Sequence, residues 1–249
     1  MIERIDKLLV AQGFARSRTL AQQLIKEGAV EIREAGAWRM IEKASEQYLP
    51  ECELRLNQCA SLRYVSRAGL KLEYAVKRSG IDVRGKKVLD IGQSTGGFSD
   101  CLLQLDCASI TGIDVGHGQL DSRIRSDSRV RCLEGVNARN LNSNQVGSGF
   151  DLVVMDLSFI SQTLVLPGVK GLMKEGASLL SLVKPQFEVG PEGIGKGGLV
   201  RDASLYPLVQ NKIEAQLNQL GFRVIEYFES PIEGGDGNKE FFVHAQPAG

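Results

Sequence analysis

The segment at residues 88–100, VLDIGQSTGGFSD, has the composition of a loop that binds a ligand with its backbone. A short apolar run ends at Asp90, and Gly92, Gly96 and Gly97 follow before a helical pattern begins. Glycine permits a tight turn and has no side chain to collide with a bound molecule. The dinucleotide fingerprint G-x-G-x-x-G is not met, because two polar residues follow the first glycine. The segment therefore predicts a ligand-binding turn of another kind.

The spacing D-x-G-x-x-x-G-G resembles the first motif of the class I S-adenosylmethionine methyltransferases. The resemblance implies that Asp114, in GIDVG, holds the ribose hydroxyls of this cofactor and that Asn137 lies near its adenine. A nicotinamide-dependent enzyme is the alternative, since NAD uses an acidic residue at the same place; no hydride-transfer site is visible. The cofactor-binding residues implied are Asp90, Gly92, Ser94, Thr95, Gly96, Gly97, Phe98, Asp114, Asn137 and Asp156.

Four charged residues at or near the ends of expected strands are the candidates for catalysis, namely Lys71, Asp156, Lys184 and Glu240. The groups that other methyltransferases need are missing. The third expected strand ends in MDLSF rather than in an N-P-P-Y motif for amine methylation. No cysteine follows a proline, as C5 methylation of cytosine would require. Both of these reactions are disfavoured.

In the contexts SRAGLKL, VVMDLSFIS, LVKPQFE and GNKEFFV, these four residues resemble the Lys-Asp-Lys-Glu tetrad of FtsJ-like ribose 2′-O-methyltransferases. From about residue 2 to residue 244 the chain resembles the TlyA family, historically labelled haemolysins. The resemblance implies S-adenosylmethionine-dependent 2′-O-methylation of ribosomal RNA, with cytidine the usual target. Ala68, Gln93 and His117 depart from the family pattern, and none of them belongs to the tetrad.

A ribose hydroxyl is a weak acid, so such an enzyme must align its oxygen with the methyl group and help its proton to leave. We expect Lys184 to contact the 2′-oxygen, with Asp156 and Glu240 orienting that lysine. Lys71 would steady the ribose and its adjacent phosphate. Whether Lys184 is a true base or an electrostatic stabiliser is open from the sequence.

From Lys87 onward, strands alternate with helical stretches, which predicts a Rossmann-like, doubly wound, mostly parallel α/β sheet. We expect a helix over residues 97–104 and a long mobile loop over residues 188–202, which are rich in glycine. This loop would close over RNA as a lid. The expected strands are KVLDIG, SITGIDVG, FDLVVMDLSF, ASLLSLVKPQF, FRVIEYFESPI and KEFFVHAQ.

The N-terminal segment predicts two helices, the second capped by Ser17 and ended by Gly28, followed by a small hairpin from Val30. Its pattern R-x-D-K-L-L, then S-R-x-x-A-x-x-L-I-x-x-G-x-V, resembles the S4 RNA-binding domain over residues 2–57. EIREAGAW stands where that family usually has an Asn-Gly turn. We expect a small α+β S4-like domain in residues 1–60 and an FtsJ-like methyltransferase domain in residues 61–249. The expected RNA contacts are Arg4, Arg16, Arg18, Lys26, Arg67, Lys196 and Arg201.

The net charge of zero conceals an asymmetry. Residues 1–89 hold 17 Lys and Arg against 11 Asp and Glu, whereas the remainder holds 13 against 19. A basic first part favours a polyanionic partner, here ribosomal RNA or ribosomal subunits. Five cysteines without a C-x-x-C pair, and two histidines, predict reduced thiols and no metal site. We expect a cytoplasmic protein with no membrane span.

Two functions of other classes are alternatives to the enzyme. A ribosome assembly factor could keep the RNA-binding fold without catalysis, although the intact tetrad disfavours this. A pore-forming cytolysin would agree with the historical label, but the sequence has no amphipathic hairpin, membrane span or secretion signal.

Overall fold

The computed structural model describes residues 2–57, 59, 62–234 and 237–248. It divides into two compact units, and the division falls between Tyr64 and Val65. The domain boundary predicted after residue 60 lies outside the described residues. Each unit has a hydrophobic core of its own. Within the described part of the chain, no helix is both long and apolar enough to cross a membrane.

In the N-terminal unit two helices, α1 (Ile5–Ala11) and α2 (Arg18–Lys26), pack on a small antiparallel sheet of order β3-β2-β5. The Ser17 hydroxyl accepts a hydrogen bond from the Leu20 amide at 3.2 Å, so it caps α2 as predicted. A two-stranded ribbon, β1-β4, completes the unit. The strands are β1 (Glu3–Arg4), β2 (Val30–Glu34), β3 (Ala37–Met40), β4 (Gln47–Tyr48) and β5 (Leu54–Leu56).

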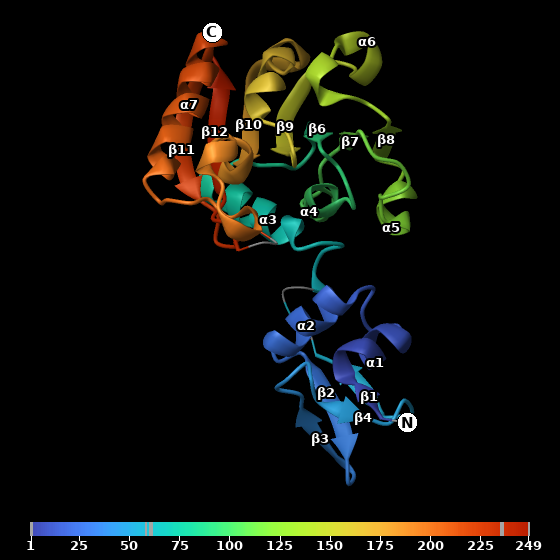
Figure 1. The fold of residues 1–249 in the computed structure, drawn as a ribbon. Coiled ribbons are helices and arrows are strands. Elements are labelled where there is room, and N and C mark those ends of the chain that lie inside the picture. The colour runs from blue at the N-terminus through green and yellow to red at the C-terminus, as the bar shows by residue number, and fades with distance from the viewer. Residues whose placement is uncertain (1, 58, 60–61, 235–236, 249) are drawn as a thin grey trace. The chain divides into compact units, whose positions relative to one another are not determined.

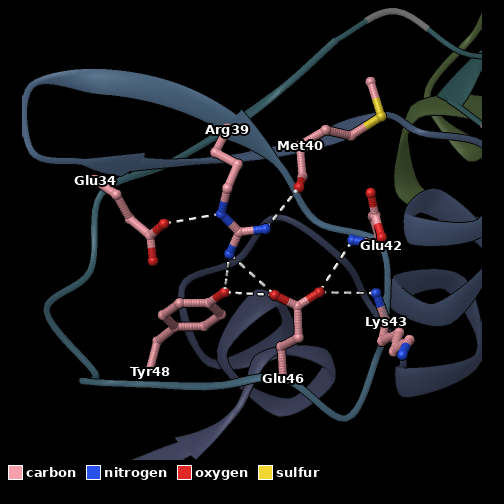
Figure 2. A network of polar contacts seen from close by, with 7 residues as sticks. All are labelled: Glu34, Arg39, Met40, Glu42, Lys43, Glu46 and Tyr48. Carbon is pink, nitrogen blue, oxygen red and sulfur yellow. Dashed lines mark hydrogen bonds and ion pairs between the residues drawn. The ribbon is translucent and has the colours of Figure 1, made fainter.

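The turn between β2 and β3 forms without an Asn-Gly pair. Ala35 and Gly36 both have positive φ, 49° and 85°, as the central residues of a type I′ hairpin turn do. Beyond β3, a polar network ties the strand to the following segment (Figure 2). Arg39 pairs with Glu34 at 2.8 Å and with Glu46 at 3.0 Å, and Tyr48 donates to Glu46 at 2.6 Å.

The C-terminal unit is built on a seven-stranded sheet of order β11-β12-β10-β9-β6-β7-β8, with β11 and β8 at the edges (Figure 1). Neighbouring strands from β10 to β8 are parallel, whereas β12 is antiparallel to both of its neighbours. This confirms the predicted mostly parallel, doubly wound sheet. The strands are β6 (Lys87–Ile91), β7 (Ser109–Asp114), β8 (Val130–Glu134), β9 (Phe150–Asp156), β10 (Met173–Val183), β11 (Phe222–Glu229) and β12 (Phe241–Pro247). β8 was not predicted from the sequence, and its residues are only partly buried at the sheet edge.

Helices cover both faces of this sheet. One face packs against α7 (Leu205–Gln219), whose Val209, Ile213 and Leu217 are buried in the same cluster as residues of β6, β9, β10 and β12. Aromatic contacts place two further helices over the opposite face. Tyr74 of α3 (Ala68–Ser79) packs on Phe228, and Phe98 of α4 (Gly97–Gln104) packs on Phe242. The short helices are α5 (Ser122–Arg125), α6 (Ser143–Val146), η2 (Ala138–Asn140), η3 (Gln162–Leu164), η4 (Leu166–Gly168), η5 (Lys170–Leu172), η6 (Pro185–Phe187), η7 (Pro191–Gly193) and η8 (Lys196–Gly198).

Candidate active site

The order of the sheet reverses between β6 and β9, because the chain proceeds from β6 toward one edge and from β9 toward the other. At such a switch point the loops after the two strands diverge and leave a crevice at their carboxyl ends. Gly92 follows β6 and Asp156 ends β9, so both lie at this crevice. A small cavity there is lined by Ser66, Ala68, Gly92, Gln93, Ser94, Thr95, Gly97, Phe98 and Asp156.

The turn after β6 depends on glycine because neighbouring protein segments approach it closely. Gly92 has φ +86°, and a Cβ on it would lie 2.3 Å from the carbonyl oxygen of Asp156. A Cβ on Gly96 would lie 2.7 Å from Leu120, and one on Gly97 would lie 2.1 Å from the Ser66 hydroxyl. Protein packing alone therefore requires glycine at these positions, in addition to the clearance for a ligand that the sequence predicts. These glycines let neighbouring protein segments approach the turn, which shapes it.

Asp114, at the end of β7, is bound to the turn itself. Its carboxylate accepts from the Ser94 amide at 2.7 Å and from the Gly116 amide at 2.7 Å. Ser94 has φ +48°, so this bond holds a left-handed residue at the head of the turn. Each carboxylate oxygen keeps a further lone pair for a diol. Asn137 is exposed, and its side chain accepts from the Arg139 amide at 3.0 Å.

Asp90 lies beneath the turn and is fully buried. Its Oδ2 accepts from the Ser99 hydroxyl at 2.7 Å, and that hydroxyl accepts from the Gln93 amide nitrogen at 2.8 Å. Oδ1 of Asp90 and Oε1 of Gln93 have no hydrogen-bond partner among the described residues. Burial raises the pKa of Asp90 to about 7, and the charges of Asp156 and Asp114 act in the same direction.

This buried carboxyl predicts a pH-dependent stability. The folded-state pKa of Asp90 exceeds the unfolded value, so ionisation progressively destabilises the fold as pH rises from about 4 to about 7. We expect Asp90→Asn, which can still accept from Ser99, to raise the free energy of unfolding at pH 8 by up to about 4 kcal/mol. The gain should disappear near pH 4, as measured by urea unfolding at both pH values. A gain independent of pH would contradict this explanation.

The four tetrad residues form two ion pairs. The Lys71 ammonium lies 2.5 Å from Glu240 Oε2, and both side chains are buried. The Lys184 ammonium lies 2.6 Å from Asp156 Oδ1 and donates to the Ser158 hydroxyl at 2.9 Å. The side chain of Lys184 is 13% exposed, so it alone of the two lysines keeps appreciable access to solvent.

A cavity of about 310 Å³ brings the two pairs to one place, since it is lined by Lys184 from one pair and Glu240 from the other. Its volume is in the range of small-molecule sites. Its other described lining residues are Ser158, Phe159, Gln186, Phe187, Ile194 and Gly198.

The observed pairs differ from the expected arrangement in two respects. Glu240, which the sequence predicted to orient Lys184, pairs with Lys71. Lys71, which the sequence predicted to steady the ribose and its phosphate, is buried against Glu240 and is not among the described residues that line the cavity. Only the contact between Asp156 and Lys184 corresponds to the arrangement expected from the sequence.

The predicted RNA contacts divide into two kinds. In the N-terminal unit, Arg4 and Arg18 both pair with the buried carboxylate of Asp6, at 3.0 and 2.9 Å, although their own side chains are 39% and 52% exposed. The arginine and glutamine donors around Asp6 hold the pKa of that carboxyl far below its usual range, despite its burial. The other candidates are exposed: Arg16, Lys26, Arg67, Lys196 and Arg201.

Residues 188–202 are not a loop without regular structure, contrary to the prediction. They contain η7, η8 and a β-bridge between Ile194 and Val200. The buried side chain of Asn238 accepts from the Val200 amide at 2.9 Å and donates to the Gly198 carbonyl at 3.0 Å. The loop is thereby tied to the segment that carries Glu240.

Phe159 was not identified from the sequence. This residue has φ +64° and is 90% exposed, and its ring centroid lies 5.2 Å from that of Phe187. Both conformation and exposure are unusual for a phenylalanine. The segment DLSFIS has the pattern of the end of an apolar strand, so neither the left-handed backbone nor the exposure of Phe159 could be predicted from it.

The chain is similar to known proteins over most of its length. A model of the FtsJ-like methyltransferase family matches residues 64–246, and a model of the S4 domain matches residues 3–32. The 16S/23S rRNA (cytidine-2′-O)-methyltransferase TlyA of Mycobacterium tuberculosis is 39% identical over 240 residues, which is 96% of this chain and 88% of that protein. Hemolysin A of Brachyspira hyodysenteriae is 34% identical over 97% of this chain and 98% of its own length. The solved structure of a hemolysin-named protein of Streptococcus thermophilus aligns with a TM-score of 0.76 at 37% identity, over 99% of this chain and 89% of that one.

Proposed function

Since the chain belongs to the FtsJ-like methyltransferase family, we propose that it transfers a methyl group from S-adenosylmethionine to a ribose 2′-hydroxyl of ribosomal RNA. The observation that carries the proposal is the arrangement of the tetrad, because two lysine–carboxylate pairs border one cavity beside the crevice of the sheet. Cytidine is the target nucleoside we propose, as the name of the mycobacterial relative indicates for that protein. The S4 domain supports a folded RNA as the substrate.

The residues at the crevice fit S-adenosylmethionine. The left-handed turn at Gly92 and Ser94 presents its backbone to the small cavity at the crevice. The buried Asp90 and Gln93 side chains have oxygens with unused hydrogen-bonding capacity. The carboxylate of Asp114 would bind the ribose diol of the cofactor, and the backbone from Gly92 onward would face its methionine part. When bound, the cofactor supplies a methyl group that is already activated by its sulfonium.

The tetrad then has two tasks. Lys184, the more exposed lysine, would contact the 2′-oxygen and favour loss of its proton, while Asp156 and Ser158 hold the ammonium in place. The buried pair of Lys71 and Glu240 would present the Glu240 carboxylate on the cavity wall, where it can accept a hydrogen bond from the ribose. In this scheme Lys71 acts through Glu240.

Phe159 would position the target base. An aromatic ring that is almost fully exposed at the rim of the cavity offers a face on which an unstacked nucleobase can stack. Stacking of this kind contributes about 1–3 kcal/mol per base in other RNA-binding sites. Left-handed backbone at a non-glycine residue stores strain, which is common where a side chain is held out for function.

We therefore expect Phe159→Ala to lower kcat/KM for RNA about 10- to 100-fold, the equivalent of one lost stacking contact. Phe159→Trp should retain most of the activity, because it keeps the aromatic face. The affinity for S-adenosylmethionine, measured by calorimetry, should change less than twofold in both variants. Equal losses for alanine and tryptophan would argue against stacking.

The proposed function is tested by methyl transfer from labelled S-adenosylmethionine to ribosomal subunits and to the free RNA. A labelled methyl group on a ribose whose 3′-phosphate linkage resists alkaline cleavage would establish 2′-O-methylation. The methylated ribose lacks the free hydroxyl that attacks the phosphate. Cofactor binding without transfer to any of these substrates would favour the catalytically inactive assembly factor instead.

A further inference from the structure

We propose that Glu188 is a positioning residue, which holds the loop after β9 and the loop after β10 at the separation that the active site requires. It does not belong to the tetrad, and it is not among the described residues that line the cavity. This inference rests on the proposed function, because the site whose geometry Glu188 sets is the one to which we assign methyl transfer.

The Glu188 carboxylate is buried and has partners in two other segments. Its side chain is 2% exposed. One oxygen accepts from the backbone amide of Gln162 at 2.8 Å, and the other accepts from the Ser161 hydroxyl at 2.5 Å. The Lys212 ammonium of α7 donates to the second oxygen at 3.0 Å and to the Glu188 carbonyl at 2.9 Å. A buried carboxylate has lost its hydration and needs such hydrogen-bond partners in its place, so its position and theirs are fixed together.

The loop after β10 is stiff between this contact and the tetrad. The Phe187 amide donates to the Lys184 carbonyl and the Glu188 amide to the Pro185 carbonyl, each at 2.9 Å, which forms the single turn η6. Lys184 and Glu188 therefore lie at opposite ends of one short turn. A shift of Glu188 would be transmitted to Lys184, since the hydrogen bonds and the proline leave this segment little conformational freedom.

The loop after β9 is held in the same way from its far end. Ser161 and Gln162 lie two and three residues beyond Phe159, and the Gln162 side chain accepts from the Ser181 hydroxyl of β10 at 2.6 Å. The two loops meet at the cavity through Lys184 and Ser158, and again at depth through Glu188. The deeper contact fixes where Phe159 stands relative to Lys184.

The test is Glu188→Gln, which keeps the size and one acceptor oxygen but replaces the other oxygen by an amide nitrogen that cannot accept a hydrogen bond. We expect kcat/KM for RNA to fall about tenfold, while the Kd for S-adenosylmethionine stays within twofold. The loss should not multiply with that of Phe159→Ala. Because residues that act through one another are non-additive, the double variant should be at least about fivefold more active than the product of the single losses predicts.

A second measurement does not depend on activity. Hydrogen exchange followed by mass spectrometry should be faster in Glu188→Gln for peptides covering residues 157–163, because the Gln162 amide loses a charged acceptor. Exchange in the turn at residues 88–98 should not change. The matched control is Glu214→Gln on α7, where the Glu214 carboxylate accepts a hydrogen bond from Gln210 of the same helix. This variant should alter neither measurement.

The outcomes separate this inference from the proposed function. If the wild-type protein methylates no ribose, the proposed function is wrong. Hydrogen exchange would still decide whether Glu188 joins the two loops. An active wild type with multiplicative losses, or unchanged exchange in residues 157–163, would overturn the inference. Loss of cofactor binding in Glu188→Gln would also overturn it, because Glu188 would then support the whole unit.

Discussion

Lys184→Met is expected to lower methyl transfer at saturating RNA by about 10²- to 10⁴-fold, the usual contribution of a group that assists proton transfer. Lys184 is the lysine that lines the cavity, and its ammonium is aligned by Asp156 at 2.6 Å and Ser158 at 2.9 Å. Methionine has a similar length and no charge, so the cavity should keep its shape. The measurement is single-turnover transfer of labelled methyl to RNA.

The chain offers a matched control for this variant. Lys174 of β10 pairs with Asp151 of β9 at 2.7 Å, near the start of the two strands, whereas Asp156 ends β9 and Lys184 directly follows β10. Lys174→Met removes a lysine–aspartate pair of the same composition and should leave the rate within about twofold, since exposed pairs contribute little. If Lys184→Met also retained a near-normal rate, Lys184 would have no role in activating the hydroxyl.

Gly92→Ala is expected to weaken S-adenosylmethionine binding by at least about 100-fold and to lower the free energy of unfolding by roughly 2–4 kcal/mol. Two penalties act together. Alanine at φ +86° is strained, and its Cβ would lie 2.3 Å from the backbone oxygen of Asp156, which cannot move without moving the end of β9. Calorimetric titration with the cofactor and urea unfolding would measure the two effects.

Gly80→Ala separates the strain from the collision. Gly80 ends α3 at φ +67°, and a Cβ there would have no atom within 4 Å. This control should lose only about 1 kcal/mol, the difference between alanine and glycine in a left-handed conformation, and should bind the cofactor normally. Equal behaviour of the two variants would mean that the close approach of Gly92 to Asp156 has no special importance.

Much of the architecture follows from local patterns. Short apolar strands with helical stretches between them predict a doubly wound sheet, and the glycine-rich turn after Asp90 predicts where the sheet binds a ligand. β8 could not be predicted from the sequence, because it lies at the sheet edge, where partial burial leaves no continuous apolar run. The regular turns within residues 188–202 could not be predicted either, because Asn238, far along the chain, stabilises them.

The types of chemical group at the site could be predicted from the sequence, since the glycine turn is one local string and each tetrad residue lies in a short string of its own. How these groups pair depends on the tertiary structure. Lys71 and Glu240 are 169 positions apart, and they meet because α3 and the segment before β12 pack at the same part of the sheet. Local periodicity sets which face a side chain occupies, but not its neighbour across the fold. For the same reason, the burial of Asp90, the strained exposure of Phe159 and the contacts of Glu188 appear only when distant segments come together.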